Sequence, residues 1–559
     1  MNSDVGDRIE WADVLVVGSG AAAMAAALTS SVNGLDVVVL EKSPWLGGTS
    51  AMSGASTWIP ANRHARAAGL QDSEEEALTY LRAASPEGWA EEEDPLWQAF
   101  VSAAPRLLDL LEAETPLRFT PTKEADPFAE MPGGKRGGRN LSIEPVRKSV
   151  AGPFARRIRP TPIFHIFTYV EMTVSGSYHH PIRTVLSLGA RLLWRWITGR
   201  RGQGTALIAG LTAGCLAHGC CIELDARVVD LATDPDTGGV MGATVEGADG
   251  RRRRLGARRG VVLATGGFEW NQALREKYFP GPTDWLCSPR VNEGDGQILA
   301  EKVGARLAHM DQANIHPAVP TVYEGKLQGV PVAWHAEPHS IIVDRNGRRF
   351  VSELDYNIGE ALDERDPTTG VPVRLPAWLI ADRRFLTRSL PFRWFASKDK
   401  SWIRRAPSLD ALAEITGLPA EALKGEIARF NGFCEAGVDN DFHRAESANE
   451  RLRAEGDPRN SLKPILQPPF VAIPMNRVIL GTKGGPRTND QGQVLRPDGS
   501  VITGLYCAGN AMANPFGTRS LGAGTTIGPG MTWGYICAQA MLRENRSLGR
   551  SLGAKGMDR

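Results

Sequence analysis

The chain has 559 residues, of which 42% are apolar and 23% charged, as is usual for a globular protein with at least two domains. Lysine and arginine total 64 and aspartate and glutamate 63, so the formal charge of +1 gives no indication of a nucleic-acid partner. Seven cysteines without a CxxC pair argue against a disulfide framework and a metal site, and favour a reducing, cytoplasmic location. The acidic N-terminus carries no apolar signal segment, and no apolar run is long enough to cross a bilayer.

The N-terminal segment has the pattern of a dinucleotide-binding turn. A short apolar run, Val14 to Val17, predicts a buried parallel strand, and a G-x-G-x-x-A turn leads into an alanine-rich helix that ends near Ser31. A second predicted strand ends at Leu40, and Glu41 follows the turn at the spacing that the fingerprint requires. We expect the turn to hold a pyrophosphate and Glu41 to accept from a ribose hydroxyl. An ordinary tight turn between a strand and a helix is the alternative.

Three further segments favour a flavin over a nicotinamide cofactor. EKSPWLGGTSAMSGASTWIP (41–60) is crowded with small residues, so we expect a large flat group to lie against it. RGVVLATGGFEWN (259–271) predicts a returning strand, and GLYCAGNAMANPFGTRSLGAGTTIGPGMTWGY (504–535) predicts a strand, a glycine-rich loop and a helix that begins near Thr525 or Thr526. These segments resemble the flavoprotein family of succinate dehydrogenase, fumarate reductase and the 3-ketosteroid dehydrogenases.

The resemblance implies that FAD is the cofactor. Carried onto the matching positions, it gives as cofactor residues Gly18, Ser19, Gly20, Ala21, Ala22, Glu41, Lys42, Gly48, Thr49, Ser50, Gly54, Val228, Ala264, Thr265, Gly266, Asp295, Gly509, Asn510, Gly522, Thr525 and Ile527. Some members attach FAD through a histidine, but none lies between Gly47 and Pro60, so we expect non-covalent FAD. The helix after the glycine-rich loop is expected to face the flavin with its N-terminus and to favour the reduced ring.

The predicted fold is α/β, with a discontinuous Rossmann-like FAD-binding domain and an inserted cap. We assign residues 1–279 and 474–559 to the FAD-binding domain and residues 280–473 to the cap. The cap segment mixes strand-like stretches, such as HSIIVDRNGRRFVSELDYN (339–357), with a helical stretch over 408–437, which indicates α+β structure. Pockets often lie at such domain interfaces.

Within the family, PFGTRSLGAGTTIGPGMTWGY (515–535) is most similar to 3-ketosteroid dehydrogenases, which remove two hydrogens beside a ring ketone. The resemblance implies that the hydride goes to flavin N5 and the proton to Tyr356. It also implies that the Ser520 hydroxyl and the Gly524 amide hold the ketone oxygen, which is oxyanion-hole chemistry. The expected partners are a small hydrophobic ring ketone and an electron acceptor that the sequence does not indicate.

The chain departs from the family pattern at two positions that carry tyrosine in relatives. Ser520 replaces one of these tyrosines, and Pro127 and Phe128 stand in the place of the other. Tyr169 and Tyr178 lie in an unusual segment and could supply a missing hydroxyl. These departures leave the position of desaturation open.

Two other functions are compatible with the sequence. A fumarate-reductase-like enzyme that reduces an unsaturated acid or enone needs cationic groups for a carboxylate, and Arg519 lies beside the glycine-rich loop. His316, His335 and His339 are weak candidates for its partner, since such histidines more often serve structure. A flavin-holding protein without turnover is the third interpretation, which the loss of two tyrosines would suit.

The segment PIRTVLSLGARLLWRWITGRR (181–201) predicts an amphipathic helix with arginine and tryptophan towards its C-terminal end. One expectation is a helix that faces the core of the flavin domain. The other is a helix at a membrane surface or at the mouth of an apolar pocket, which would give the protein a peripheral membrane contact.

Overall fold

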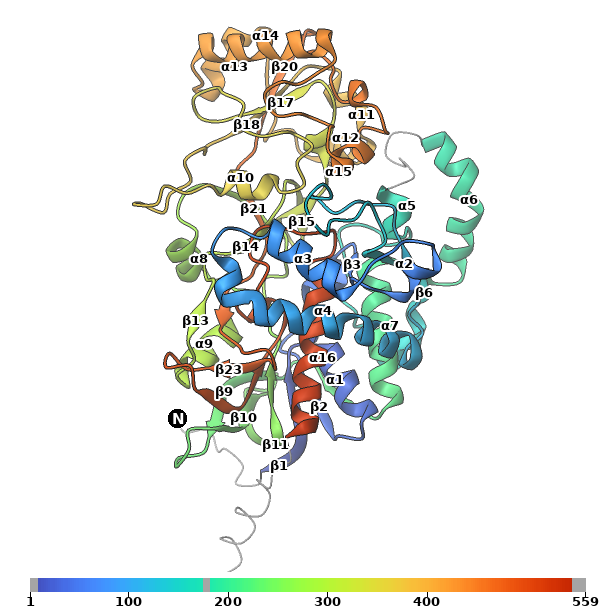
Figure 1. The fold of residues 1–559 in the computed structure, drawn as a ribbon, viewed down its shortest axis with the longest axis vertical. Coiled ribbons are helices and arrows are strands. Elements are labelled where there is room, and N and C mark those ends of the chain that lie inside the picture. Colours follow the sequence, from blue (N-terminus) through green and yellow to red (C-terminus); the bar gives the residue numbers. More distant parts are fainter. Residues whose placement is uncertain (1–8, 174–180, 545–559) are drawn as a thin grey trace, which may run out of the picture.

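The computed structural model describes residues 9–173 and 181–544, which form an elongated molecule with a base and a cap at opposite ends (Figure 1). The base contains an eight-stranded sheet, and the cap contains a four-stranded sheet. The chain begins in the base, crosses to the cap in its middle part and returns to the base with its last strands and helix. The predicted α/β fold with an inserted cap is therefore confirmed.

Five parallel strands form the centre of the base sheet in the order β24, β11, β1, β2 and β8. Their bounds are Val501–Cys507 for β24, Arg252–Leu263 for β11, Glu10–Val17 for β1, Val37–Leu40 for β2 and Cys221–Glu223 for β8. The antiparallel strands β9 (Arg227–Thr233), β10 (Val240–Glu246) and β23 (Gln493–Leu495) extend the sheet. The apolar runs in β1 and β2 are almost completely buried, as in parallel strands covered on both faces.

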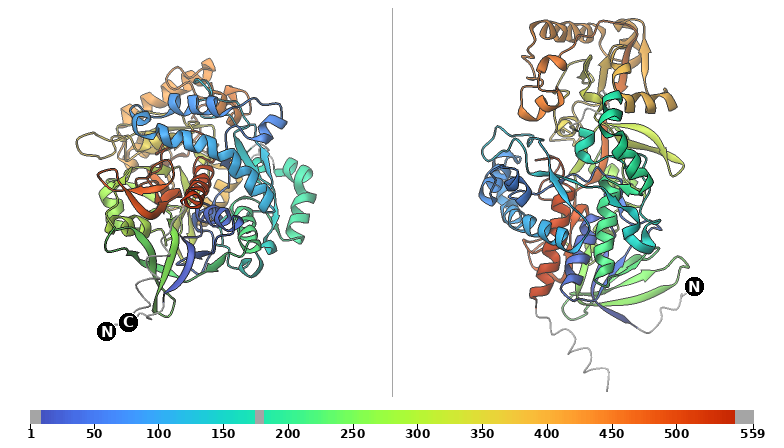
Figure 2. Two further views of the ribbon diagram at one scale, coloured as in Figure 1. Left: turned by 60° about the horizontal axis from the view of Figure 1, so that its bottom comes forward. Right: turned by 90° about the vertical axis from the view of Figure 1, so that its right-hand side faces the viewer.

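Two helices, α1 (Ala21–Val32) and α16 (Ile527–Arg543), pack against each other beside this sheet (Figures 1 and 2). Small residues bring them close: a Cβ on Gly534 would lie 2.2 Å from the carbonyl oxygen of Ala22. The helix α16 begins at Ile527, directly after the predicted start. The same close contact brings the first turns of both helices to one edge of the sheet, where the parallel strands end.

The cap is an α+β unit. Its antiparallel sheet has the order β17, β18, β20, β19, with bounds Ser340–Val343, Trp378–Ala381, Phe470–Pro474 and Arg404–Ala406. Helices α13 (Leu409–Thr416) and α14 (Ala420–Ala436) cover one side of this sheet and share a core with it. A second, aromatic core containing Trp334, Phe385 and Trp402 packs against the opposite face of the sheet.

Base and cap are joined by strands from both chain segments. The strand β12 (Thr283–Leu286) pairs in parallel with β21 (Arg477–Thr482), and β14 (Ala313–Ile315) pairs with β21 from its other side. The helix α9 (Asp295–Lys302) follows β12 in the chain but packs on β9 of the base. Residues after 280 therefore contribute to both units, and the boundaries at 279/280 and 473/474 stay a prediction.

The remaining elements surround these two units. The other helices are α2 (Arg63–Ala67), α3 (Glu74–Ala84), α4 (Trp89–Glu114), α5 (Tyr169–Thr173), α6 (Pro181–Ile197), α7 (Gln203–Ala217), α8 (Gln272–Tyr278), α10 (Ile358–Leu362), α11 (Phe385–Arg388), α12 (Leu390–Lys398) and α15 (Ala448–Arg453). The other strands are β3 (Thr57–Trp58), β4 (Phe119–Pro121), β5 (Asn140–Ile143), β6 (Val146–Arg147), β7 (Arg200–Arg201), β13 (Leu307–Ala308), β15 (Ala318–Tyr323), β16 (Lys326–Pro331) and β22 (Gly485–Pro486).

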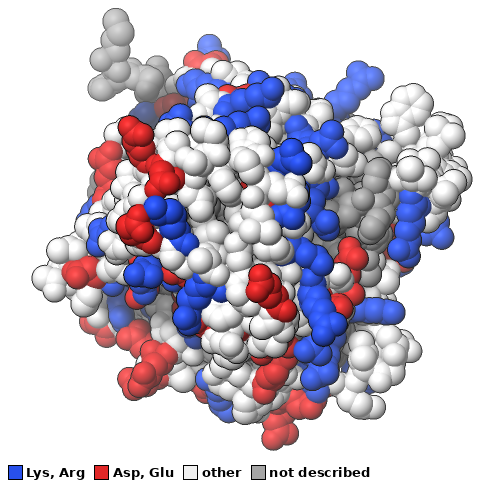
Figure 3. Space-filling model, turned by 90° about the horizontal axis from the view of Figure 1, so that it is seen from above, with Lys and Arg blue, Asp and Glu red and all other residues white. Residues whose placement is uncertain are grey.

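The helix α6 projects from the side of the molecule (Figures 1 and 2). The expectation that it faces the core is wrong, because Ile182 is 77% and Leu186 83% exposed, and both Trp194 and Trp196 are more than half exposed. From above the cap, uncharged side chains gather at the right-hand edge, where Figure 1 places α6, whereas both signs of charge mix over the rest of this face (Figure 3). Within the described residues, no helix is both long and apolar enough to cross a membrane.

Candidate active site

One continuous cavity runs from the edge of the base sheet to the cap. Its volume is about 2200 Å³. Ligand pockets typically measure roughly 300–1,000 Å³, so this cavity has room for a cofactor together with a second ligand. The base end is lined by the turn between β1 and α1, and the far end by cap residues and by α6.

The turn between β1 and α1 shows why its two glycines differ. Gly18 has a φ of +106°, and a Cβ there would lie 2.4 Å from the carbonyl oxygen of Ala264 in β11's C-terminal extension, so only glycine permits this contact. Gly20 has a φ of −66°, and its Cβ would meet only Ser50 Oγ, at 3.6 Å. The protein's own packing thus requires glycine at position 18 but not at position 20, which lines the cavity.

The first turn of α1 fits a phosphate group. The N-cap residue Gly20 has no side chain to cap the helix, and the only side-chain acceptor at its first N–H is the uncharged Ser50 Oγ, 3.0 Å from Ala21 N. The first turn holds no acidic residue, so no charge opposes the partial positive charge of the N-terminus. Such helix N-termini bind phosphates, and glycine at position 20 allows close approach to the backbone. Together with the cavity's volume, these features fit FAD.

Glu41 lies at the end of β2, buried in the cavity wall. Its Oε2 accepts a hydrogen bond from Ser19 Oγ at 2.5 Å, and its Oε1 accepts from the backbone N–H of Ser43 at 2.9 Å. Ser19 Oγ accepts in turn from the N–H of Gly47 at 2.9 Å. These bonds fix the carboxylate and leave it lone pairs for a further donor, such as the expected ribose hydroxyl.

Lys42 and Asp295 meet at the same wall although they are far apart in the sequence. Lys42 Nζ lies 2.5 Å from Asp295 Oδ2, and Asp295 Oδ1 lies 2.8 Å from Arg227 Nη2. The positive charge of Lys42 and the negative charge of Asp295, both predicted cofactor residues, are therefore compensated within the protein. The contact holds α9 against the base, and a role of either residue towards FAD stays a prediction.

Every residue predicted to bind FAD or to act on a ring ketone through Tyr356, Ser520 and Gly524 lines the cavity, except Gly522. At the cofactor end, the lining also includes Ala21, Ala22, Gly48, Thr49, Gly54, Val228, Thr265, Gly266, Gly509, Asn510, Thr525 and Ile527. At the cap end, it includes Tyr356, Ser520 and Gly524.

Two glycines of the loop after β24 make close contacts within the protein. A Cβ on Gly522 would lie 2.2 Å from Trp58 Cδ1, and Gly522 does not line the cavity, so the indole explains this glycine. Gly524 has a φ of +92°, and its Cβ would lie 2.4 Å from the carbonyl oxygen of Ser56. Both glycines are thus required by close contact with the segment around β3, and only Gly524 also presents its backbone to the cavity.

At the cap end, two tyrosines face a buried carboxyl group. Tyr169 donates its hydroxyl to Glu124 Oε2 at 2.8 Å, and Asn140 Nδ2 donates to the same oxygen at 2.8 Å. Burial, and after it the charge of Glu124, raises the pKa of both Tyr169 and Tyr356. Tyr169 therefore brings a hydroxyl into the cavity, whereas Tyr178 lies outside the described residues.

The Ser520 hydroxyl is engaged by its own loop. Its Oγ lies 3.1 Å from the carbonyl oxygen of Gly522, to which it donates, and 2.8 Å from Thr525 Oγ1. Asn357 fixes the backbone of Ser520 from both sides, because Asn357 Oδ1 accepts from its N–H at 2.6 Å and Asn357 Nδ2 donates to its carbonyl at 3.0 Å. A hydrogen bond with Ser520 also lowers the pKa of Tyr356, although burial outweighs it.

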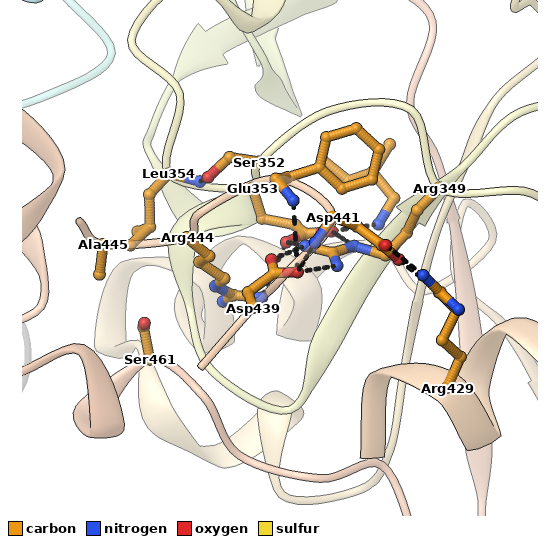
Figure 4. A network of polar contacts seen from close by, with 12 residues as sticks. Arg349, Ser352, Glu353, Leu354, Arg429, Asp439, Asp441, Arg444, Ala445 and Ser461 are labelled. Atoms are coloured by element: carbon orange, nitrogen blue, oxygen red, sulfur yellow. Dashed lines mark hydrogen bonds and ion pairs between the residues drawn. The ribbon is translucent and has the colours of Figure 1, made fainter. Parts of the chain in front are cut away.

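A buried network of charges holds the loop that carries Tyr356 (Figure 4). Arg349 Nη2 lies 2.8 Å from Glu353 Oε2 and 2.9 Å from Asp439 Oδ2. Arg444 Nη1 also contacts Glu353 Oε2, at 2.9 Å. Because Glu353 precedes Tyr356 closely in the chain, these contacts fix the backbone that presents the phenol to the cavity.

Arg519, expected to bind a carboxylate in a reductase of unsaturated acids, already has a carboxylate partner. Its Nη2 lies 2.7 Å and its Nε 2.9 Å from oxygens of Glu360, and its Nη1 donates to the carbonyl of Ala84 at 3.2 Å. Arg519 does not line the cavity. The structure therefore gives no support to the fumarate-reductase-like alternative at this residue.

The three candidate histidines differ in position. His316 lines the cavity, and its Nδ1 lies 2.9 Å from the carbonyl oxygen of Pro317, so Nδ1 carries the proton. Burial lowers the pKa of His316 to about 4. His335 is completely buried behind it, with ring centres 5.4 Å apart, and His339 Nδ1 donates to the carbonyl of Pro464 at 2.8 Å. Burial lowers the pKa of all three, so they are neutral around neutral pH.

The sequence patterns do not indicate two polar residues that lie at the cap end of the cavity. Glu124 belongs to a loop after β4, and Arg453 is the last residue of α15. Only tertiary structure brings them to Tyr356, since neither stands in a motif. The Arg453 Cζ lies 5.1 Å from the centre of the Tyr356 ring.

Known proteins agree with this geometry. A family described as FAD binding domain matches residues 13–527. The 3-oxosteroid 1-dehydrogenase of Mycobacterium tuberculosis (strain ATCC 25618 / H37Rv) is 37% identical over 94% of this chain and 97% of its own. The 4-oxocyclohexanecarboxylate 2-dehydrogenase of Sinomonas cyclohexanicum is 34% identical over 95% and 92%. The 3-ketosteroid delta1-dehydrogenase from Sterolibacterium denitrificans, solved in complex with 1,4-androstadiene-3,17-dione, superposes with a TM-score of 0.86 at 32% identity over 95% of this chain and 99% of that chain.

The fold and the cavity define an FAD-dependent oxidoreductase whose inserted cap closes over the cofactor site. The chain belongs to the family of FAD-binding flavoproteins that includes these dehydrogenases. The predicted cofactor and the predicted class of dehydrogenase are thereby confirmed against the reductase and flavin-holding interpretations.

Proposed function

We propose that the protein removes two hydrogens from neighbouring carbons beside a ring ketone, with 3-ketosteroids as the first substrate class to test. The observation that carries the proposal is the meeting of Tyr356 with the Gly524 backbone and Ser520 in one buried cavity that also reaches the cofactor turn. The names of the relatives, which specify 3-oxosteroids and 4-oxocyclohexanecarboxylate, support a cyclic ketone.

The roles of the chain's own residues follow from their chemistry. The Gly524 amide donates to the ketone oxygen and stabilises the enolate that forms there. Tyr356 takes the proton from the carbon beside the ketone, and the second hydrogen leaves the next carbon with its electron pair. FAD held at the turn between β1 and α1 would supply the acceptor for that hydride, and an electron acceptor would be needed to reoxidise it. The buried wall around Tyr356 excludes water, so the proton stays on the phenol until the product leaves.

The proposal is tested by mixing the oxidised protein without oxygen with a panel of 3-ketosteroids, cyclohexanone-type ketones and fumarate. We expect a ring ketone to bleach the flavin absorbance and fumarate to leave it unchanged. In Tyr356→Phe, bleaching should slow by a factor of about 10²–10⁴, the usual contribution of a general base. FAD content should stay normal, because Tyr356 lies at the far end of the cavity.

Tyr323→Phe serves as the control, since Tyr323 is also a buried cap tyrosine but its hydroxyl donates to the carbonyl of Pro160. If no cyclic ketone bleaches the flavin, the substrate class is wrong. If bleaching by a ketone is as fast in Tyr356→Phe as in the unchanged protein, Tyr356 is not the proton acceptor.

We further propose a peripheral membrane contact through α6, with an otherwise cytoplasmic protein. Ile182, Leu186, Trp194 and Trp196 expose apolar surface, whereas the sequence 181–201 holds five arginines and no acidic residue. Cationic residues beside exposed tryptophans favour an anionic bilayer surface. Because Thr184 and Val185 of the same helix line the cavity, an apolar substrate could pass from the bilayer into the cavity.

Sedimentation with phosphatidylglycerol vesicles tests this contact. We expect the protein to pellet with the vesicles and Ile182→Ser/Leu186→Ser to pellet at least ~10-fold less, since each exposed side chain contributes about 1.5–3 kcal/mol when buried. Ile415→Ser/Val438→Ser, on the exposed end of the cap, is the control and should pellet normally. Equal pelleting of both variants would contradict the contact.

A further inference from the structure

The guanidinium of Arg453 lies against the Tyr356 ring and makes no ion pair within 4.0 Å in the described part of the chain, although its charge acts on the carboxyl groups of Glu124, Asp355 and Glu450. Its Cζ is 5.1 Å from the ring centre, and its Nη1 donates to the carbonyl of Leu354 at 3.2 Å. Two buried arginines of the cap, Arg349 and Arg444, each have a carboxylate within ion-pair distance. A cation held at the face of this ring stabilises negative charge that develops on the ring.

We propose that Arg453 is a positioning residue that stabilises the phenolate form of Tyr356 and so sets the pH at which this tyrosine accepts a proton. The inference rests on the proposed function, in which Tyr356 is the proton acceptor. A neutral phenol is too weak a base to take a proton from carbon, so the reacting form is the phenolate. The anion has more electron density on its ring than the phenol, and a cation at the ring face therefore favours it.

The groups around the phenol act in opposite directions. Burial, then the carboxyl group of Glu124, raises the pKa of Tyr356, whereas Arg453 and the hydrogen bond with Ser520 lower it. Tyr169 from α5 faces the same phenol, and Asp355 stands next to it in its own loop. Burial raises the pKa of both Glu124 and Asp355, which favours their neutral forms. Burial also raises the pKa of Glu450, one turn before Arg453 in α15, to about 7. Arg453 is the cation among these groups, and its sign favours the anion.

Two features of the surroundings keep the cation in place. The hydrogen bond to Leu354 ties Arg453 to the loop of Tyr356 itself, so the two groups move together. Arg453 also closes α15, whose Ser447 cap accepts from the N–H of Glu450, and Asn449 of this helix donates to the carbonyl of Ala125 at 2.7 Å. The helix is thus attached to the segment that leads from Glu124, and the cation, the carboxyl group and the phenol share one wall.

The experiment compares the pH dependence of flavin reduction by the best ring ketone in Arg453→Gln, Arg453→Lys and the unchanged holoenzyme. We expect the pH midpoint of the rise in rate to move up by about 1–3 units in Arg453→Gln, the usual effect of removing an opposite charge at this range. Arg453→Lys should restore part of the shift. Arg459→Gln, which removes an exposed arginine outside the cavity, should leave the midpoint unchanged.

A second readout does not depend on turnover. The tyrosinate difference absorbance of the holoenzyme should lose one titrating group in Tyr356→Phe, and that group should titrate at higher pH in Arg453→Gln. In the double variant Tyr356→Phe/Arg453→Gln, the tyrosinate titration should be the same as in Tyr356→Phe alone. This separates the inference from the proposed function: fast flavin reduction in Tyr356→Phe rejects the proton acceptor, whereas an unshifted Tyr356 titration in Arg453→Gln rejects the role of Arg453.

One other outcome would overturn the inference. If Arg453→Gln raises the KM for a ketone that bears a carboxylate, leaves the KM for an uncharged ketone unchanged and shifts neither titration, then Arg453 binds the substrate and does not act on Tyr356.

Discussion

The two ends of the cavity are built in different ways. At the base end, one continuous stretch from β1 to Glu41 supplies the turn, the helix N-terminus and the buried carboxylate. At the cap end, Tyr356, Tyr169, Arg453 and Ser520 come from four segments far apart in the chain. The cofactor end therefore depends on local backbone conformation, whereas the reacting end depends on how base and cap hold distant segments together.

The first prediction concerns the cofactor end and separates its two glycines. Gly20→Ala should fold, because its Cβ meets only Ser50 Oγ at an ordinary distance, yet it should bind FAD at least ~10-fold more weakly, since a methyl group then lies where a pyrophosphate approaches. The measurement is FAD content after purification together with the thermal unfolding temperature. Gly18→Ala should instead lower the unfolding temperature as well, because its Cβ meets backbone. Normal FAD retention in Gly20→Ala would contradict the assignment of this turn.

The same contrast explains what the sequence could predict. The ends of both strands, the turn and the helix between Val17 and Glu41 agree with the prediction to within about one residue, since each step depends on neighbours in the chain, whereas β1 begins at Glu10 and not at Val14. Tyr356 and Gly524 were found through family motifs. Glu124 and Arg453 could not be found, because their importance arises only when α15 and the loop after β4 meet at the phenol.

Gly522 and α6 show two further limits of sequence patterns. A glycine in a cofactor-binding loop suggests contact with the cofactor, but its missing side chain here makes room for Trp58. An amphipathic helix suggests a face towards the core, but α6 exposes its apolar face. Periodicity shows that a helix has an apolar side and does not show what covers that side.

The second prediction concerns the buried charge network behind Tyr356. Glu353→Gln removes one of two carboxylates that compensate Arg349 and Arg444, which leaves buried positive charge unpaired. The free energy of unfolding should fall by about 3–5 kcal/mol. Flavin reduction should slow because the loop of Tyr356 loosens, while FAD content should stay normal if the two ends of the cavity are independent.

Asp441→Asn provides the matched control for this network. Asp441 pairs with Arg429, whose side chain is 57% exposed, so the pair contributes at most about 1 kcal/mol. Urea denaturation of both variants measures the difference. An equal loss of unfolding free energy in both variants would mean that the buried network stabilises the cap no more than a surface ion pair does.

The third prediction tests the packing role of Gly522. A methyl group in Gly522→Ala would meet the Trp58 indole, so we expect a loss of about 1–3 kcal/mol in stability from overpacking. FAD content should be unchanged, because Gly522 does not line the cavity. The suppressor Trp58→Leu, which removes the clash, should return part of the lost stability to Gly522→Ala. Loss of FAD without loss of stability would restore the cofactor role.

The smallest expected effect belongs to Ser520, at the boundary between the two ends. Its hydroxyl has one proton, for which the carbonyl of Gly522 at 3.1 Å and Thr525 Oγ1 at 2.8 Å are both in reach. Removing an oxyanion-hole donor usually costs a factor of about 10²–10³ in rate. Because the loop already engages this hydroxyl and the Gly524 amide remains, we expect Ser520→Ala to slow flavin reduction by less than about 10-fold. Ser520→Thr keeps the hydroxyl and is the control. A loss of 10²-fold or more in Ser520→Ala, with normal rates in Ser520→Thr, would mean that the hydroxyl turns from its loop to the ketone when substrate binds.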